Sequence, residues 1–266
     1  MSERVRTEIR DNIAYVTMTR GDKFNGLDLE MFHALVAAAK ELKSNRDVRA
    51  VILQGEGPAF CAGLDFASVG KNPVKFALNF LRVPGRATNL YQQVCWAWRE
   101  LPMPVIAVVH GRCYGGGLQL ALAADFRFAT PDCEFSIMEA KWGLVPDMTG
   151  SVTLRELLGM DVAKRLTMTG ESFDGERAAA LGVVTEASPT PLKAAEALAE
   201  QLATRSPDAV AATKFLFNRT RHLSPRAAFR IESRFQRRLL NGANHKIARA
   251  AGMAKEVPQF VRRTFR

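Results

Sequence analysis

Apolar and polar residues follow two different patterns along the first 190 residues. Compact runs rich in Val, Ile and Leu predict buried strands, and these runs lie at 5–10, 13–19, 50–53, 105–109 and 133–138. Longer segments with apolar residues every three or four positions predict helices, and these lie at 28–43, 86–100, 118–123, 150–158, 161–166 and 175–181. Asp28 stands where the first helix needs an N-cap, and Asp11-Asn12 predicts a hairpin turn. Strands that alternate with helices favour an α/β fold.

The pattern changes after Pro189. From there on, every periodic segment is helical, and the predicted helices lie at 192–205, 208–219, 225–240 and 244–253. The sequence therefore predicts a sheet-containing core over residues 1–190 and a helical region over residues 191–266. Phe215, Leu216, Phe229 and Phe235 give this region apolar faces that a small appendage would struggle to bury alone, which predicts an oligomer.

A glycine-rich turn joins a predicted strand to a predicted helix in the middle of the chain. The strand at 105–109 leads through His110 to Gly115-Gly116-Gly117, where the next helix begins. Backbone N–H groups at a helix start have no intrahelical partner, and without a Cβ they can approach a ligand closely and attract negative charge. Alternatively, the glycines merely let the strand and the helix pack closely.

A second turn of small residues, 57–65, follows the strand at 50–53. Two such turns could each direct one backbone N–H at the same point. An oxyanion hole requires this arrangement, because two fixed donors stabilise an oxygen that gains negative charge during the reaction.

Four ordered motifs carry a resemblance to a known family. They are FCAGLD (60–65), HGRCYGGGLQLALAADFRFA (110–129), SIMEAKWGLVPDMTGS (136–151) and LTMTGESFDGERAAALGVVTE (166–186). Together they cover most of the chain, which resembles the crotonase superfamily, the enoyl-CoA hydratases and isomerases. The resemblance implies a crotonase-like spiral of ββα units with a C-terminal helical trimerisation region. It therefore implies a homotrimer or a dimer of trimers.

The same resemblance assigns roles to particular residues. The backbone N–H groups of Leu64 and Gly116 would bind the thioester carbonyl of an acyl-CoA and stabilise the enolate. Coenzyme A would enter as part of the substrate, with no permanently bound cofactor, and the carbonyl of Ala62 would accept from its adenine amino group. The residues expected near the acyl-CoA are Lys23, Asn25, Ala62, Gly63, Asp65, Gly115 and Gln119. The segment 71–84 would border the acyl group.

The sequence departs from the hydratase pattern at Gln119. Hydratases of this family carry one glutamate there and a second where Glu139 stands, and the two carboxylates hold a water and move its protons. A glutamine can hydrogen-bond but does not titrate. Glu139 alone favours the removal of a proton from one carbon and its return to another, which shifts a double bond. Glu139 could instead be a surface carboxylate paired with Lys141.

Asp147 lies eight residues after Glu139, the spacing at which dienoyl-CoA isomerases of this superfamily pair an aspartate with the glutamate. The match is partial, because their third acidic residue would fall on Gln119. Alternatively, Asp147 caps the helix that starts near Thr149. We expect Trp142 to lie in the core and His110 to be structural.

Charge and composition narrow the possible partners and the location of the protein only slightly. The net charge of +10 would attract a polyanion, but the excess lies late, at 219–238 and 262–266, and no aromatic residues interleave with it as in RNA-binding motifs. A solvated or subunit-interface face is the preferred interpretation, so nucleic acid is not an expected partner. Four cysteines without C-x-x-C spacing indicate neither a metal site nor disulfides. No signal peptide or membrane span is recognised, which favours a cytoplasmic location.

The sequence therefore predicts an enzyme of the enoyl-CoA hydratase/isomerase type. The preferred reaction shifts a double bond of an enoyl- or dienoyl-CoA, with Glu139 and Asp147 as catalytic side chains. Hydration or other enolate chemistry on an acyl-CoA is the main alternative. A non-catalytic RNA-binding homologue is a weaker one, suggested only by the charge.

Overall fold

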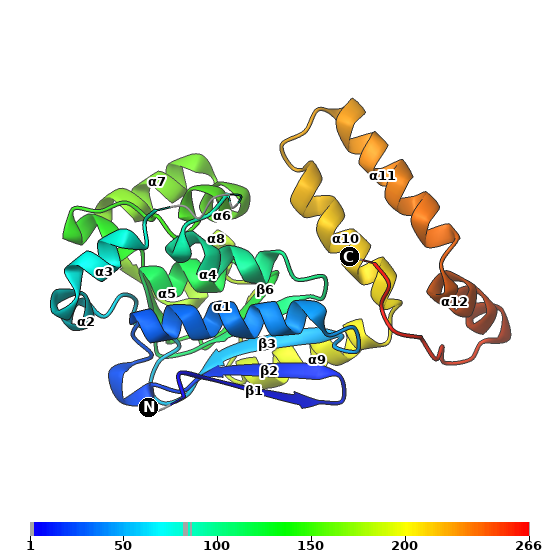
Figure 1. Cartoon of the computed structure of the whole chain (residues 1–266), viewed down its shortest axis with the longest axis horizontal. Coiled ribbons are helices and arrows are strands. Elements are labelled where there is room, and N and C mark those ends of the chain that lie inside the picture. Colours follow the sequence, from blue (N-terminus) through cyan, green and yellow to red (C-terminus); the bar gives the residue numbers. More distant parts are fainter. Residues whose placement is uncertain (1–2, 82–84, 86, 266) are drawn as a thin grey trace.

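The computed structural model describes residues 3–81, 85 and 87–265, and its elements alternate as the sequence predicts (Figure 1). The strands are β1 (Val5–Arg10), β2 (Ile13–Met18), β3 (Ala50–Gly55), β4 (Val105–Val109), β5 (Arg112–Tyr114), β6 (Phe126–Ala129), β7 (Glu134–Ser136), β8 (Ser172–Phe173) and β9 (Glu186–Ala187). The helices before residue 190 are α1 (Leu29–Ser44), α2 (Phe66–Lys71), α3 (Pro73–Leu78), α4 (Leu90–Arg99), α5 (Gly116–Leu122), α6 (Gly150–Leu157), α7 (Met160–Thr169) and α8 (Gly175–Leu181). Two 3₁₀ turns are η1 (Gly21–Lys23) and η2 (Met138–Trp142), and the late helices are α9 (Pro191–Ala203), α10 (Pro207–Thr220), α11 (Pro225–Leu240) and α12 (Ala243–Ala254).

Six strands form the main sheet in the order β1-β2-β3-β4-β6-β9. Only the β1–β2 pair is antiparallel, and Asp11 and Asn12 turn between these strands with φ values of 51° and 62°. Such positive values at both turn residues match the twist of a two-residue hairpin. The other neighbours are parallel, with Val51 opposite Val105 and Ile106 opposite Phe126. A small second sheet, β5-β7-β8, extends from the glycine-rich turn.

The central strands β3 and β4 are buried on both faces, because successive side chains point to opposite faces and helices pack on each. On one face, Val51 and Leu53 join the large core that also includes the inner sides of α1, α4 and α5. On the other face, Ile52 and Ile106 pack against Ala195 of α9. The mixed α/β fold that the sequence predicts is thereby confirmed.

The starts of helices follow the expected chemistry. The Asp28 carboxylate accepts the N–H of Met31 at 2.8 Å, as predicted for the cap of α1. The helix predicted at 86–100 begins at Leu90, because Asn89 and Gln92 form a capping box there. Arg86 itself lies outside the described residues. Within 71–84, where the periodicity is weak, the chain forms α3, and residues 82–84 also lie outside the described part.

Helix α9 lies beyond the boundary expected at residue 190, yet it packs on the sheet. Its Ala195 and Ala199 are fully buried there, and the hydroxyl of Tyr15 on β2 donates to Glu196 at 3.1 Å. The division at residue 190 remains a prediction, but α9 contributes to the core. Helix α10 is tied to the core by the buried ammonium of Lys214, which lies 2.6 Å from the carboxylate of Asp125.

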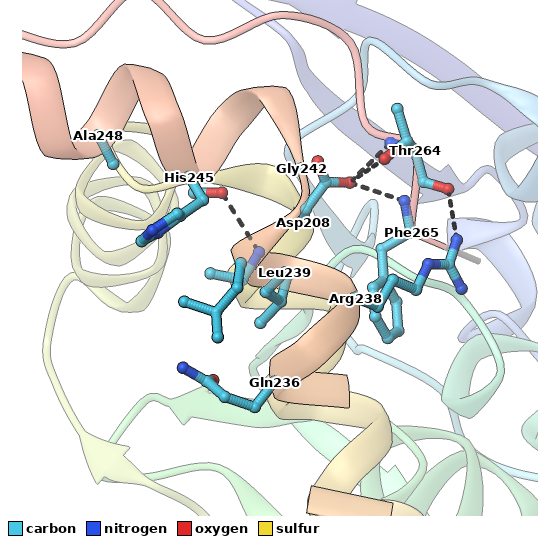
Figure 2. A pocket seen from close by; sticks show the side chains of 12 residues that line it. Asp208, Gln236, Arg238, Leu239, Gly242, His245, Ala248, Thr264 and Phe265 are labelled. Atoms are coloured by element: carbon cyan, nitrogen blue, oxygen red, sulfur yellow. Dashed lines mark hydrogen bonds between the residues drawn. The ribbon is translucent and has the colours of Figure 1, made fainter. Parts of the chain in front are cut away.

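Helices α11 and α12 stand apart from the sheet, and the last residues return to α10 (Figure 1). The carboxylate of Asp208 accepts the N–H groups of Thr264 and Phe265 at 2.6 and 2.7 Å (Figure 2). The ring of Phe265 packs with Phe215 and Phe235, so two of the four apolar residues expected at a subunit interface are buried within the chain. Phe229 remains 60% exposed. No helix of the described residues is long and apolar enough to span a membrane.

Candidate active site

A cavity of about 430 Å³ lies between the two predicted turns, α2, α3 and the segment from η2 to α6. Of the eleven residues predicted for the active site, eight border this cavity: Ala62, Gly63, Leu64, Gly115, Gly116, Gln119, Glu139 and Asp147. Residues from three separate stretches, 62–64, 115–119 and 139–147, thus converge, as the resemblance implies. Lys23, Asn25 and Asp65 do not border it.

The first turn fixes the direction of the Leu64 N–H. Residue Leu27 bonds to both neighbours of Leu64: its N–H donates to the carbonyl of Gly63 at 2.8 Å, and its carbonyl accepts from Asp65 at 3.1 Å. This parallel bridge turns the Leu64 N–H away from Leu27, and among the described residues no backbone carbonyl accepts it. The N–H is therefore available to a ligand.

The second turn brings the Gly116 N–H to the same place. Gly115 has φ of 48° and ψ of −118°, a conformation that glycine adopts readily, and Gly116 is the first residue of α5. A Cβ placed on Gly63 would lie 2.8 Å from the Tyr114 carbonyl oxygen and 3.6 Å from the Gly116 nitrogen. The two turns are in contact only because glycine stands at position 63.

Glu139 lies on η2, beside Gly115, and is only 9% exposed. Its Oε1 accepts a 2.6 Å hydrogen bond from the amide nitrogen of Gln119, and its Oε2 is buried with no hydrogen-bond partner among the described residues. The alternative that Glu139 is a surface carboxylate is therefore wrong. One carboxylate oxygen is held and the other is free to exchange a proton.

Asp147 lines the same cavity and is exposed within it. Helix α6 begins at Gly150 with Thr149 as its N-cap, and the Gly150 N–H donates to the side-chain oxygen of Gln119 at 3.0 Å. Among the described residues, no hydrogen bond joins the Asp147 carboxylate to this helix start. The capping interpretation of Asp147 is therefore not supported, and its carboxylate faces the cavity.

The cavity shifts the pKa values of both carboxyls upward. Burial raises the pKa of Glu139, and the nearby charge of Asp147 adds to that, while the hydrogen bond from Gln119 opposes it. Partial desolvation by the surrounding cavity also raises the pKa of Asp147, although the residue is exposed by surface area. Raised values make both carboxylates stronger bases, which suits groups that take protons from carbon. Burial and the charge of Asp147 raise the pKa of the Tyr91 phenol from about 10 to about 12, so this group is neutral at pH 7 by a wide margin.

Six aromatic residues also line the cavity, and we call them the aromatic wall: Phe32, Phe66, Phe76, Phe80, Tyr91 and Trp142. The rings of Phe66 and Trp142 lie 4.5 Å apart, and Trp142 is 60% exposed, so the expectation that it belongs to the core is wrong. The apolar spacing of 91–98 did indicate a helix face, but sequence spacing could not show that Tyr91 also borders a cavity.

The residues outside the cavity have structural contacts. Asp65 caps α2 through the Ser68 N–H at 3.1 Å and forms an ion pair with Arg20 at 2.8 Å. Asn25 is buried, and its amide donates to the carbonyls of Glu56 and Ala59, which joins the loop after β2 to the first turn. Lys23 ends η1 on the surface. Contacts of Lys23 and Asp65 with coenzyme A remain predictions.

Known proteins are similar to this chain over most or nearly all of its length. A peroxisomal Delta(3,5)-Delta(2,4)-dienoyl-CoA isomerase of Arabidopsis thaliana is 29% identical, over 98% of this chain and 96% of its own length. An (E)-benzylidenesuccinyl-CoA hydratase of Thauera aromatica is 30% identical, over 79% of this chain and 80% of its own length. A solved enoyl-CoA hydratase of Mycobacterium tuberculosis H37Rv is 32% identical, with a TM-score of 0.87 over 98% of this chain and 99% of that one. The sequence profile of the enoyl-CoA hydratase/isomerase family matches residues 8–262, and the chain belongs to that family.

Proposed function

We propose that the protein shifts a double bond of an enoyl- or dienoyl-CoA thioester, with Glu139 as the principal proton carrier. One observation carries the proposal. The residue opposite Glu139 is the neutral amide of Gln119, and its oxygen already accepts the N–H groups of Met148 and Gly150 at 2.8 and 3.0 Å. This oxygen is therefore engaged, and an amide does not titrate, so Gln119 cannot share a water's protons with Glu139.

In the proposed reaction, the thioester carbonyl accepts the N–H groups of Leu64 and Gly116. The Glu139 carboxylate removes a proton from the carbon next to that carbonyl, and the electron pair passes into an enolate whose oxygen the two N–H groups stabilise. The protonated carboxyl then returns the proton to the carbon at the far end of the extended enolate. The double bond moves one position toward the thioester, with no net gain or loss of atoms.

Asp147 extends this scheme to conjugated substrates. It lines the same cavity as Glu139 and lies close enough for its charge to raise the pKa of that carboxyl. A 3,5-dienoyl thioester delocalises the enolate over a longer chain, so the proton must return farther from where it left. A second carboxyl at the distal end can deliver it, and this supports a dienoyl-CoA as a substrate.

Assays with three thioesters test the proposal. Ultraviolet absorbance distinguishes the formation of a conjugated 2-enoyl or 2,4-dienoyl thioester from a 3-enoyl or 3,5-dienoyl substrate, and crotonyl-CoA reports hydration by loss of absorbance. We expect isomerisation to be faster than hydration. Rapid hydration of crotonyl-CoA with no detectable isomerisation would show that the inference from Gln119 is wrong.

Hydration is the second candidate, because Asp147 supplies a further carboxylate in the same cavity and relatives of this chain include a named hydratase. In that reaction Asp147 and Glu139 would hold the water between them. The substitution Asp147→Asn separates the candidates: it would abolish hydration, whereas isomerisation of a simple 3-enoyl thioester would persist.

Three further expectations accompany the proposed function. Coenzyme A enters only as part of the substrate, with its adenine amino group bound by the Ala62 carbonyl. The exposed Phe229 supports assembly into a homotrimer or a dimer of trimers, which light scattering would reveal. The cytosol is the proposed location. An RNA-binding role is disfavoured, since both carboxylates and both glycine turns are retained around one cavity; filter binding with mixed RNA at about 150 mM salt tests it.

A further inference from the structure

The side chain of Gln119 is a buried bridge between two segments that carry the candidate catalytic carboxylates. It lies on α5, is 2% exposed, and contacts η2 on one side and the start of α6 on the other. Its nitrogen donates to Glu139 Oε1 at 2.6 Å, while its oxygen accepts from Met148 and Gly150. Three strong hydrogen bonds therefore meet at one amide.

The backbone dictates which way this amide faces. Thr149 has φ of 77° and ψ of 3°, a left-handed conformation that is rare for a β-branched residue, and it turns the N–H groups on either side toward one point. Two donors can be satisfied only by an oxygen, so the amide nitrogen must face Glu139. A Cβ on Gly150 would lie 2.9 Å from the Gln119 oxygen, so glycine at this position leaves room for the bridge.

This orientation makes Glu139 Oε1 an acceptor and leaves Oε2 to carry the proton. The N–H of Gln119 favours the carboxylate over the carboxylic acid, whereas burial and the charge of Asp147 favour the acid. The other titratable groups around the cavity are the phenols of Tyr91 and Tyr114, whose pKa values are raised by burial. None of the described residues that line the cavity is Lys, Arg or His. Together with the backbone N–H of Glu139 itself, Gln119 is thus the neighbour that favours the ionised form of this carboxyl.

The same amide also fixes where Asp147 stands. Met148, which directly follows Asp147, is held by its N–H on the Gln119 oxygen at 2.8 Å, and Gly150 is held at 3.0 Å. A change at position 119 would therefore disturb both carboxylates together. Residues that hold catalytic groups in this way affect rate strongly, because small misplacements of a reacting group are costly.

We infer that Gln119 is a positioning residue. It holds Glu139 so that Oε1 accepts its hydrogen bond and Oε2 carries the proton, and it places the segment that bears Asp147 beside Glu139. The inference rests on the proposed function for its kinetic consequence. Its electrostatic consequence concerns the titration of Glu139 and can be measured without substrate.

The test uses full-length protein with ¹³C at the glutamate side-chain carboxyls, and Glu139→Gln assigns the Glu139 signal. Gln119→Met keeps the size of the side chain but removes all three hydrogen bonds. Gln119→Glu keeps an acceptor for Met148 and Gly150 but places a second carboxyl beside Glu139. The matched control is Gln54→Met, because Gln54 is a half-buried glutamine on β3 that donates to Thr17 at 3.1 Å and does not border the cavity.

We expect the pKa of Glu139 to rise in Gln119→Met, because the donor that favours the carboxylate is gone. It should rise further in Gln119→Glu, where the two carboxyls share a proton and titrate as a coupled pair. Gln54→Met should leave the titration unchanged. With isomerase substrates, Gln119→Met should lower kcat about 10- to 100-fold while KM changes only a few-fold, and the acid limb of the rate profile should move to higher pH.

An unchanged Glu139 titration in a folded Gln119→Met protein would overturn the inference and leave Gln119 a structural residue. If Gln119→Met does not fold, Gln119→Glu becomes the test, because that variant keeps an acceptor for the N–H groups at the start of α6. In that case, independent titration of the two carboxyls, Glu139 and the new glutamate, would overturn the inference. If Glu139 responds as expected but no thioester is isomerised, the positioning role stands and the proposed function fails.

Discussion

The two sides of the cavity are built from different parts of the chain. The floor consists of backbone: two glycine turns so close that a Cβ on Gly117 would lie 2.4 Å from the Cys61 carbonyl oxygen, with Gln119 and Glu139 fixed beside them. The wall consists of side chains from α1 to α4, the segment after α3 and η2, and several are exposed, including Phe80 at 53% and Trp142 at 60%. A fixed floor suits groups that must be held in place while bonds change, and an exposed apolar wall suits the selection of an acyl group. We therefore expect changes in the floor to alter kcat and changes in the wall to alter KM.

The largest effect is expected from Glu139→Gln in the floor. Because this variant removes the proton carrier, kcat should fall by about 10²- to 10⁴-fold, while acetoacetyl-CoA should bind within a few-fold of the wild-type affinity. Initial rates and calorimetric titration measure the two quantities. If kcat stayed within a few-fold of the wild-type value, another group would have to move the proton.

The next effect is expected from Gly116→Val, which acts on the backbone donor. A Cβ at this position would lie 2.8 Å from the Met148 sulfur and 3.1 Å from a methyl group of Leu27, so the valine would push against two buried side chains and shift the backbone that carries the donor. Loss of one such donor costs about 10²- to 10³-fold in kcat. Acetoacetyl-CoA should no longer raise the Tm, although circular dichroism should remain that of the folded protein. A ligand shift equal to the wild type would contradict the assignment of the oxyanion hole.

Asp147→Asn is the third test, because Asp147 lines the cavity but belongs neither to the glycine turns of the floor nor to the aromatic wall. We expect the rate with a 3,5-dienoyl thioester to fall at least about 10-fold more than the rate with a 3-enoyl thioester, since only the longer substrate needs a distal acid. Parallel assays of the two substrates give the ratio directly. Equal losses on both would mean that Asp147 acts through the shape of its loop.

In the wall, Trp142→Ala should raise KM about 3- to 10-fold for substrates with bulky acyl groups and leave kcat within about two-fold. The reason is that the indole packs against Phe66 at 4.5 Å and has no hydrogen-bonded role in the floor. Exposed Phe217 on α10 provides the control, because Phe217→Ala removes a similar ring far from the cavity. A kcat loss as large as the KM change would break the proposed division between floor and wall.

The smallest effect concerns stability against pH. The pKa values of Glu139 and Asp147 are raised in the folded protein above their values in the unfolded chain, about 4.3 and 3.9. At any pH between the unfolded and the folded pKa values, the folded state therefore binds more protons than the unfolded state. The free energy of unfolding therefore falls as pH rises through that window. The double substitution Glu139→Gln and Asp147→Asn should flatten this slope and raise the Tm at pH 7. Thermal melts from pH 4 to 7 measure this slope. If neither pKa were raised in the folded protein, the double variant and the wild type would show the same dependence of Tm on pH.

The floor could be predicted from the sequence because its chemistry is local. Gly63 stands in a turn of small residues that follows a predicted strand, Gly115 and Gly116 stand where the next predicted helix begins, and the departure at Gln119 is visible in a single position. The contacts of Gln119 could not be predicted, because they join residues about 20 to 30 positions apart and depend on the left-handed conformation of Thr149. No propensity argument anticipates such a conformation for threonine.

The wall and the C-terminal region were less predictable for a different physical reason. Periodicity shows that Tyr91 and Trp142 have apolar surroundings but does not distinguish a filled core from the side of a cavity. Phe215 and Phe235 were interpreted as interface residues, yet Phe265, at the far end of the chain, covers them. Tertiary burial of this kind depends on where the chain returns, and short-range patterns do not contain that information.

The packing of α9 on the sheet has a consequence for the order in which the protein is made. Synthesis delivers β1 to β9 first, and the face that carries Ile52 and Ile106 stays bare until Ala195 and Ala199 have left the ribosome. The nascent sheet thus passes through an interval in which one whole side is exposed to water and to other chains. We expect the need for chaperones and the fraction of chains lost to aggregation to depend on the length of this interval, that is, on how quickly residues 191–203 follow the last strand.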